Sequence, residues 1–194
     1  MDFQSAKNYI INRLKHELSS KLYYHGLQHT LDVYDAAKKL ADTEAISGED
    51  LVLLKTAALF HDAGFIEQYS HNEIIAVKIA KEILPQFNYN DQQIGIIADI
   101  IMATEMSKPP QTILQKIICD ADLDYLGRSD FSTLAGLLKK ELNAHGFLSN
   151  DKQWDEIQIK FLEKHQYYTD SAIKKNNPGK QKHLNEIKER LGKI

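Results

Sequence analysis

The sequence has few of the residues that cross-link, interrupt or anchor a chain. Cys119 is the single cysteine among 194 residues, so no intramolecular disulfide can form. Only 4 prolines and 9 glycines interrupt the chain, which leaves room for long helices. No apolar run approaches the ~18 residues that a membrane-spanning helix needs. The first residues also lack a basic stretch followed by an apolar one, so we expect no secretory signal and a cytoplasmic location.

An excess of charge of one sign is missing as well. The formal net charge is −3 and 26% of the residues are charged, which is ordinary for a globular protein. This balance gives no reason to expect a nucleic acid or a membrane surface as the main partner. The length is sufficient for one domain with a substantial core. We therefore expect a small molecule as the partner, and the sequence does not indicate the oligomeric state.

Hydrophobic residues recur at three- and four-residue steps through most of the chain, a spacing typical of helices. A turn around Gly26 and a loop over 64–70 are expected between them, and polar breaks over 107–110 and 174–180. No stretch shows the strict alternation of a half-buried strand. The predicted fold class is all-α, a single helical bundle of roughly eight to ten helices. The expected helices cover about residues 2–19, 27–41, 51–61, 72–84, 92–103, 113–120, 130–143, 154–167 and 183–191.

The residues that could bind a metal or take part in a reaction lie at the ends of apolar segments. His61 and Asp62 directly follow the apolar run that ends at Phe60. Burying such a pair is costly unless it has partners, and both residue types commonly bind divalent cations. His29 upstream and an aspartate downstream, Asp120 or Asp122, are the candidates for the remaining ligands. Two histidines and two carboxylates leave positions on a six-coordinate ion for a water and a substrate oxygen.

The ordered set His29, His61–Asp62 and Asp122 resembles the H…HD…D signature of the HD-domain superfamily of metal-dependent phosphohydrolases. The resemblance covers about residues 25–122, with a weaker continuation to 127. It implies one HD-type domain over residues 1–194, with the motif core at 22–127 and C-terminal helices at 130–194. It also implies one divalent metal ion (Mn, Fe, Co, Ni, Zn or Mg) bound by the four side chains. Members of this superfamily usually hydrolyse phosphate esters, often nucleotides, so the implied partner is a small phosphorylated substrate.

The resemblance also suggests roles for individual residues. Ala121–Asp122–Leu123 matches the usual context of the last ligand, so Asp122 is the expected ligand and Asp120 is expected to support it, for instance by orienting a ligating histidine. In related phosphodiesterases, a histidine four residues before the first ligand is the general acid. His25 occupies that position and is the expected catalytic acid. Asp62 or Asp122 is expected to position or deprotonate the attacking water.

Some members bind a second metal through extra histidines after the His–Asp pair. His71, with Glu73 beside it, is a candidate for such a ligand. The later position of that pattern holds Thr104 instead of histidine, which argues against a second ion. The residues that bind substrate are not indicated, although Lys55 and Arg128 are possible phosphate partners. The late histidines His145, His165 and His183 are expected at the surface.

Two other functions remain open from the sequence. One is a nucleotide-sensing HD domain without turnover, which the intact ligand set argues against. The other is a di-iron HD-type oxygenase, which Thr104 argues against. Elemental analysis distinguishes this second alternative, because an oxygenase of this type would hold two irons per chain.

Overall fold

A computed structural model describes residues 1–105, 109–148 and 150–192. Every regular element in these ranges is helical, so the all-α prediction is confirmed. None of the helices in the described ranges has the length and apolar character needed to cross a membrane. A cytoplasmic location stays a prediction. The α-helices are α1 (Phe3–Glu17), α2 (Leu27–Thr43), α3 (Gly48–Phe60), α4 (Asn72–Ile83), α5 (Asp91–Ala103), α6 (Ile113–Asp122), α7 (Phe131–Ala144), α8 (Asp151–Lys164) and α9 (Asp170–Leu191), and the 3₁₀ helices are η1 (Ala63–Ile66), η2 (Leu84–Phe87) and η3 (Asp124–Gly127).

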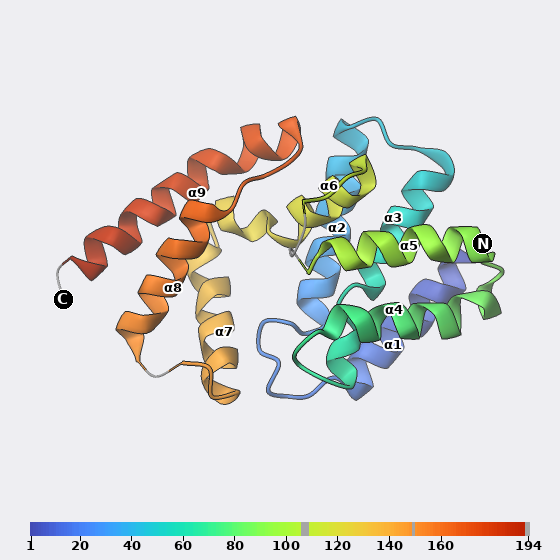
Figure 1. Ribbon diagram of the computed structural model, residues 1–194, viewed down its shortest axis with the longest axis horizontal. Coiled ribbons are helices and arrows are strands. Elements are labelled where there is room, and N and C mark those ends of the chain that lie inside the picture. Colours follow the sequence, from blue (N-terminus) through green and yellow to red (C-terminus); the bar gives the residue numbers. More distant parts are fainter. Residues whose placement is uncertain (106–108, 149, 193–194) are drawn as a thin grey trace.

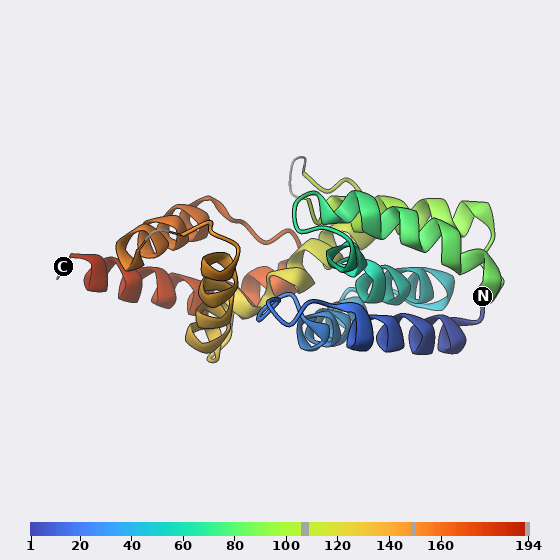
Figure 2. The ribbon, with the colours of Figure 1, turned by 90° about the horizontal axis from the view of Figure 1, so that it is seen from below.

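The helices form two groups along an elongated molecule (Figures 1 and 2). Helices α1–α6 make the larger group, which contains the N-terminus, and α7–α9 make the smaller group. The short helix η3 lies between the groups and packs against α9. The C-terminal end of α9 lies far from the N-terminus.

Helix α3 is the centre of the larger group. Its side chains are apolar on nearly every side, and those from Thr56 to Phe60 are all buried. A helix without a polar face is stable only when neighbours surround it, and α2 and α5 pack on α3. The helix ends at Phe60, so His61 and Asp62 emerge directly from the core.

Helix η1 occupies the first part of the predicted loop and sets the position of α4. A Cβ atom on Gly64 would lie 1.9 Å from the backbone oxygen of Asn72. Because only glycine allows two backbone segments to approach so closely, the start of α4 rests directly on η1. This contact brings Asn72 and Glu73 to the same cavity as Asp62.

The predicted polar break near the C-terminus is wrong, because α9 continues through Pro178. A proline inside a helix costs about 3 kcal/mol, since it removes one hydrogen bond and crowds the preceding turn. Packing against η3 offsets this cost. A Cβ atom on Gly179 would lie 2.0 Å from the oxygen of Gly127, so these two backbones touch. One turn earlier, the Asn176 amide donates to the Asp124 carboxylate at 2.8 Å.

The continuity of α9 also changes the environment of His183. His183 is only 7% exposed, and its ring stacks on Phe131 with ring centroids 4.5 Å apart. Its Nε2 atom donates to the backbone oxygen of Arg128 at 2.8 Å. His145 and His165 are likewise partly buried. The surface prediction is therefore wrong for His183, because this residue packs between elements that the sequence did not place together, whereas His145 and His165 keep part of their surface exposed.

Candidate metal centre

Four predicted ligands, from two helices and the turn that follows a third, meet at one point. His29 lies in the first turn of α2, His61 and Asp62 follow α3, and Asp122 ends α6. The His29 Nε2 atom lies 3.1 Å from Asp122 Oδ1 and 3.3 Å from Asp62 Oδ2. The His61 Nε2 atom lies 3.2 Å from Asp62 Oδ2 and 3.6 Å from Asp122 Oδ1. The tertiary structure thus brings together the whole set that the sequence suggested.

The same atoms are buried without hydrogen-bond partners. His61 is fully buried, and His29 and Asp62 are less than a tenth exposed. Both Nε2 atoms and the Asp62 Oδ2 atom lack a hydrogen bond of acceptable geometry. Buried polar atoms are almost always satisfied, so three unsatisfied atoms around one point require an explanation. A divalent cation fits this donor set, which combines two imidazole nitrogens with carboxylate oxygens.

The orientation of His61 also fits a ligand role. Its Nδ1 atom lies 2.8 Å from the backbone oxygen of Ala58, an atom that can only accept a hydrogen bond. The proton therefore resides on Nδ1, and in the neutral ring the lone pair of Nε2 faces the carboxylates. Metal-binding histidines are commonly held in this way by a carbonyl at their other nitrogen.

The histidines and carboxylates of the centre shift each other's pKa values. Burial lowers the pKa of His29, but the carboxylates of Asp122 and Asp62 outweigh it and raise that pKa to about 9. Burial opposes the same carboxylates at His61, whose pKa is raised well above its ordinary value. Burial likewise opposes the histidines at Asp62 and Asp122, and the histidines prevail and lower both pKa values. A divalent ion and two protons therefore compete for the same four side chains.

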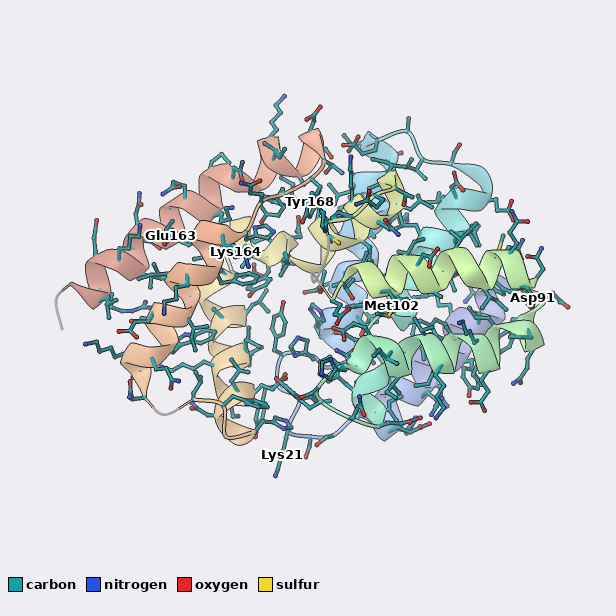
Figure 3. The ribbon with its side chains drawn as sticks, in the orientation of Figure 1. Lys21, Asp91, Met102, Glu163, Lys164 and Tyr168 are labelled. Carbon is teal, nitrogen blue, oxygen red and sulfur yellow. The ribbon has the colours of Figure 1, made fainter. Side chains whose placement is uncertain are left out.

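Asp120 serves a different purpose from the one predicted. Its carboxylate is fully buried and points toward the start of α9. It accepts hydrogen bonds from the Tyr168 N–H at 2.8 Å, the Thr169 N–H at 2.8 Å and the Thr169 hydroxyl at 2.7 Å. Figure 3 shows Tyr168 beside α6, at the segment that leads into α9. The prediction that Asp120 orients a ligating histidine is wrong, and Asp122 alone faces the centre.

Glu141 is a residue of the site that the sequence interpretation missed. This fully buried carboxylate of α7 lies 2.5 Å from the Nδ1 atom of His25. It also accepts hydrogen bonds from the backbone N–H groups of Tyr24 and His25, at 2.8 Å and 3.0 Å, and from the Tyr69 hydroxyl at 3.0 Å. A signal existed, because Glu141 stands three residues after Leu138 on the apolar face of α7. A charge on such a face needs a partner.

His71 and Glu73, the two candidate ligands of a second metal, lie in different surroundings in the structure. His71 is exposed and in the left-handed region at the N-cap of α4, with φ of 56°. Glu73 lines the same cavity as Asp62, and burial raises its pKa. Thr104 lines this cavity too, with its hydroxyl donating to the oxygen of Ile101. Among the residues that the structure describes, His29, His61 and Asp122 form the close ligand group, and His71 lies outside it.

Two cavities flank the centre. The larger has a volume of about 270 Å³ and lies between the two groups of helices. Figure 3 shows side chains from both groups facing each other there. Its walls include His25, Asp62 and Asp122, and most of the rest is apolar. The apolar lining consists of Leu123, Leu126, Phe131, Leu138, Leu142, Trp154, Ile157, Phe161 and Leu162.

The smaller cavity is more polar and has a volume of about 60 Å³. It is lined by His29, Asp122 and Arg128, together with other side chains of α2. The Arg128 guanidinium pairs with Asp130 and lies 3.6 Å from Asp32. Lys55, the other predicted phosphate partner, lies over the ring of Phe3 at 4.3 Å and lines neither cavity. Of the two cations, only Arg128 is near the centre.

Comparison with known proteins identifies the family. The model of the HD domain matches residues 26–124, which include all four predicted ligands. The chain belongs to the HD domain family. An uncharacterized protein of Clostridium beijerinckii is 35% identical over 97 residues, which are 48% of this chain and 61% of that protein. The alignment thus spans less than two thirds of this relative.

Solved structures extend the similarity of the HD-domain chain to its full length. The crystal structure of Bacillus subtilis YpgQ superposes with a TM-score of 0.70 and 20% identity, and covers 100% of this chain and 98% of YpgQ. The structure of YpgQ in complex with ADP gives a TM-score of 0.69 and 22% identity, and covers 100% of this chain and 97% of that one. The fold, including the C-terminal helices outside the family match, is therefore shared.

Proposed function

We propose that this chain is a metal-dependent phosphohydrolase that cleaves a phosphate ester of a small molecule, with a nucleotide as the favoured substrate. The observation that carries the proposal is the convergence of His29, His61, Asp62 and Asp122 with three buried, unsatisfied ligand atoms. One divalent ion would satisfy all of them. When bound there, the ion would lower the pKa of a water and polarise a phosphoryl oxygen.

The two cavities support a substrate with an apolar part and an anionic part. The larger cavity is walled by Trp154, Phe161 and several leucines, and such a surface suits a flat aromatic group. Arg128 on the other side suits a phosphate oxygen, because its planar guanidinium binds such groups well. A nucleotide combines both parts, and a solved YpgQ structure is in complex with ADP. We propose that both groups of helices act as one domain around this substrate.

His25 is the proposed general acid. Its ring lines the larger cavity together with Asp62 and Asp122. In the reaction, a water oxygen forms a bond to phosphorus while the bond from phosphorus to the leaving oxygen breaks. A carboxylate of the centre, Asp62 or Asp122, takes the proton of the water, and His25 gives a proton to the leaving oxygen. The products are an alcohol and inorganic phosphate from a monoester, or an alcohol and a phosphomonoester from a diester.

A panel of phosphomonoesters and phosphodiesters, with nucleotides of each base and phosphate length, tests the proposal. Each substrate is assayed with Mn, Fe, Co, Ni, Zn and Mg in turn, alongside elemental analysis of the purified protein. We expect turnover of at least one nucleotide with one metal per chain. Nucleotide binding without turnover under any metal would favour a sensing domain. Two irons per chain with oxygen consumption would favour an oxygenase.

A further inference from the structure

We propose that Glu141 is a positioning residue that makes Nε2 of His25 the nitrogen that gives up and regains the catalytic proton. This inference rests on the proposed function, in which His25 is the general acid. It concerns a residue outside the segment that the family model matches, which ends at residue 124. Glu141 lies 116 positions after His25 and reaches it from the other group of helices.

Hydrogen bonds around Glu141 hold its carboxylate and the ring of His25 in a fixed arrangement. The side chain of Glu141 has no exposed surface. Burial alone would raise the pKa of its carboxylate, but the hydrogen bond from His25 and the charge of that ring outweigh burial, so the pKa is lowered. Oε2 accepts both backbone N–H groups of Tyr24 and His25, so it fixes the turn that carries the ring. Oε1 accepts from the ring itself and from the Tyr69 hydroxyl. Four donors thus hold one carboxylate in place.

The ring of His25 is held from its faces as well. Phe65 stacks on it with centroids 4.6 Å apart and ring planes at 25°. Tyr24 meets it edge-on at 4.7 Å. The stacking fixes the plane of the ring, and the bond to Glu141 fixes its rotation within that plane. Packing and hydrogen bonding together leave one orientation of the imidazole.

This orientation decides which nitrogen does the chemistry. An ionised carboxylate only accepts hydrogen bonds, so Nδ1 keeps its proton whether the ring is neutral or charged. The proton that is gained and lost therefore sits on Nε2, on the opposite side of the ring. In the proposed step, the N–H bond at Nε2 breaks, the proton goes to the leaving oxygen and the neutral Nδ1–H form remains. A carboxylate that fixes a histidine tautomer has the same role in the Ser-His-Asp triad.

The test compares Glu141→Gln with wild type in the full-length, metal-loaded protein, and Glu189→Gln is the matched control. Glu189 is an exposed glutamate of α9 remote from the centre. Rates are measured with 4-nitrophenyl esters, which have a good leaving group, and with the corresponding alkyl esters, which have a poor one. We expect Glu141→Gln to lower kcat for the alkyl esters by about 10²-fold, the lower range for a general acid, with little change for the 4-nitrophenyl esters. KM and metal content should stay near wild type.

The variant His25→Ala provides the reference pattern. It should show the same selectivity for the leaving group, and the double variant should lose little more than His25→Ala alone, because both act through one proton transfer. A Glu141→Gln protein that slows all substrates alike would contradict the proposal. So would one that retains wild-type rates with the alkyl esters.

A spectroscopic measurement does not depend on turnover or on the folding of a variant. Nitrogen-15 NMR of the wild-type protein loaded with diamagnetic Zn²⁺ or Mg²⁺ reports which ring nitrogen of His25 is protonated. We expect the neutral ring to carry its proton on Nδ1. A neutral ring protonated on Nε2 would overturn the proposal. If no phosphate ester is hydrolysed but Nδ1 carries the proton, the proposed function fails while the positioning by Glu141 stands.

Discussion

The two groups of helices contribute different parts of the site. Helices α1–α6 and their loops supply every predicted metal ligand, and the family match lies almost entirely within them. Helices α7–α9 supply Glu141 and much of the apolar cavity wall, including Trp154. The candidate ion site therefore lies in the part of the chain that matches the family. The orientation of His25 and the shape of the substrate cavity depend on helices outside it.

Two aspartates of α6 show the same difference within one helix. Asp122 faces the centre, where both histidines lie within 3.6 Å of its Oδ1 atom. Asp120 faces the other way and holds the segment that starts α9. Residues two apart on a helix point in directions about 200° apart, so neighbours in sequence serve opposite groups. Substitutions at these two aspartates separate the candidate ion site from the attachment of the C-terminal helices.

The largest effect is expected from Asp62→Ala, which removes a ligand contributed wholly by the first group. Metal retention and hydrolysis should be lost together, with turnover reduced by about 10³-fold or more because the bound water is no longer activated. Elemental analysis and the nucleotide assay measure both. Asp99→Ala, which removes an exposed carboxylate of α5, is the control and should retain metal and rate. Wild-type turnover by Asp62→Ala would refute the proposed metal centre.

Asp122→Asn and Asp120→Asn should have opposite consequences. The first should lose metal and leave the folded structure in place. The second should keep one metal per chain, but it presents an amide N–H to three hydrogen-bond donors and should lower the free energy of unfolding by about 1–3 kcal/mol. Elemental analysis and urea unfolding give the two values for each variant. Loss of metal from Asp120→Asn with wild-type stability would contradict the assignment of the ligand role to Asp122.

The substitution Gly179→Ala tests the attachment of α9 to η3. The new Cβ atom would meet the oxygen of Gly127 at 2.0 Å, so the helices must separate. We expect the free energy of unfolding to fall by about 1–3 kcal/mol although alanine favours helices. Gly136→Ala in α7 is the matched control, since nothing lies within 4 Å of its Cβ atom. It should stabilise the protein by about 0.5–1 kcal/mol. Equal effects of both substitutions on thermal unfolding would contradict a close contact at Gly179.

The last prediction concerns the stability of the metal-free protein as pH changes. The pKa of His29 is raised to about 9 in the folded protein, above the value of about 6.5 in the unfolded chain. Its contribution is therefore fully present below pH 6.5 and lost as the pH rises through 9. Urea midpoints of chelator-treated protein should decline over this window.

His29→Asn should flatten this decline, whereas the exposed His16→Asn should leave it unchanged. Bound Zn²⁺ should reverse the trend, because the ion needs the neutral ring. A midpoint that rises with pH in the chelated protein would contradict the coupling between His29 and the carboxylates.

The sequence alone determined the class of fold and the candidate ligand set. Helical periodicity depends on neighbours along the chain, and the order of His29, His61–Asp62 and Asp122 can be read directly from the sequence. Local patterns failed where distant packing prevailed. Pro178 and the polar residues around it predicted a break, yet contacts of Gly179 and Asn176 with η3 keep α9 continuous.

Only the tertiary structure decided how the site is completed. Asp120 and Asp122 are the same residue type two positions apart, so the sequence does not say which one faces the centre. In the structure, Asp120 faces the segment that leads into α9, and Asp122 faces the two histidines. The pairing of His25 with Glu141 spans 116 positions and joins two groups of helices. No local spacing encodes such a contact, because it depends on how α7 packs beside the turn at Tyr24. The sequence therefore determined which residues are the candidate metal ligands, and the packing of α7–α9 decided which side chain holds the proposed acid.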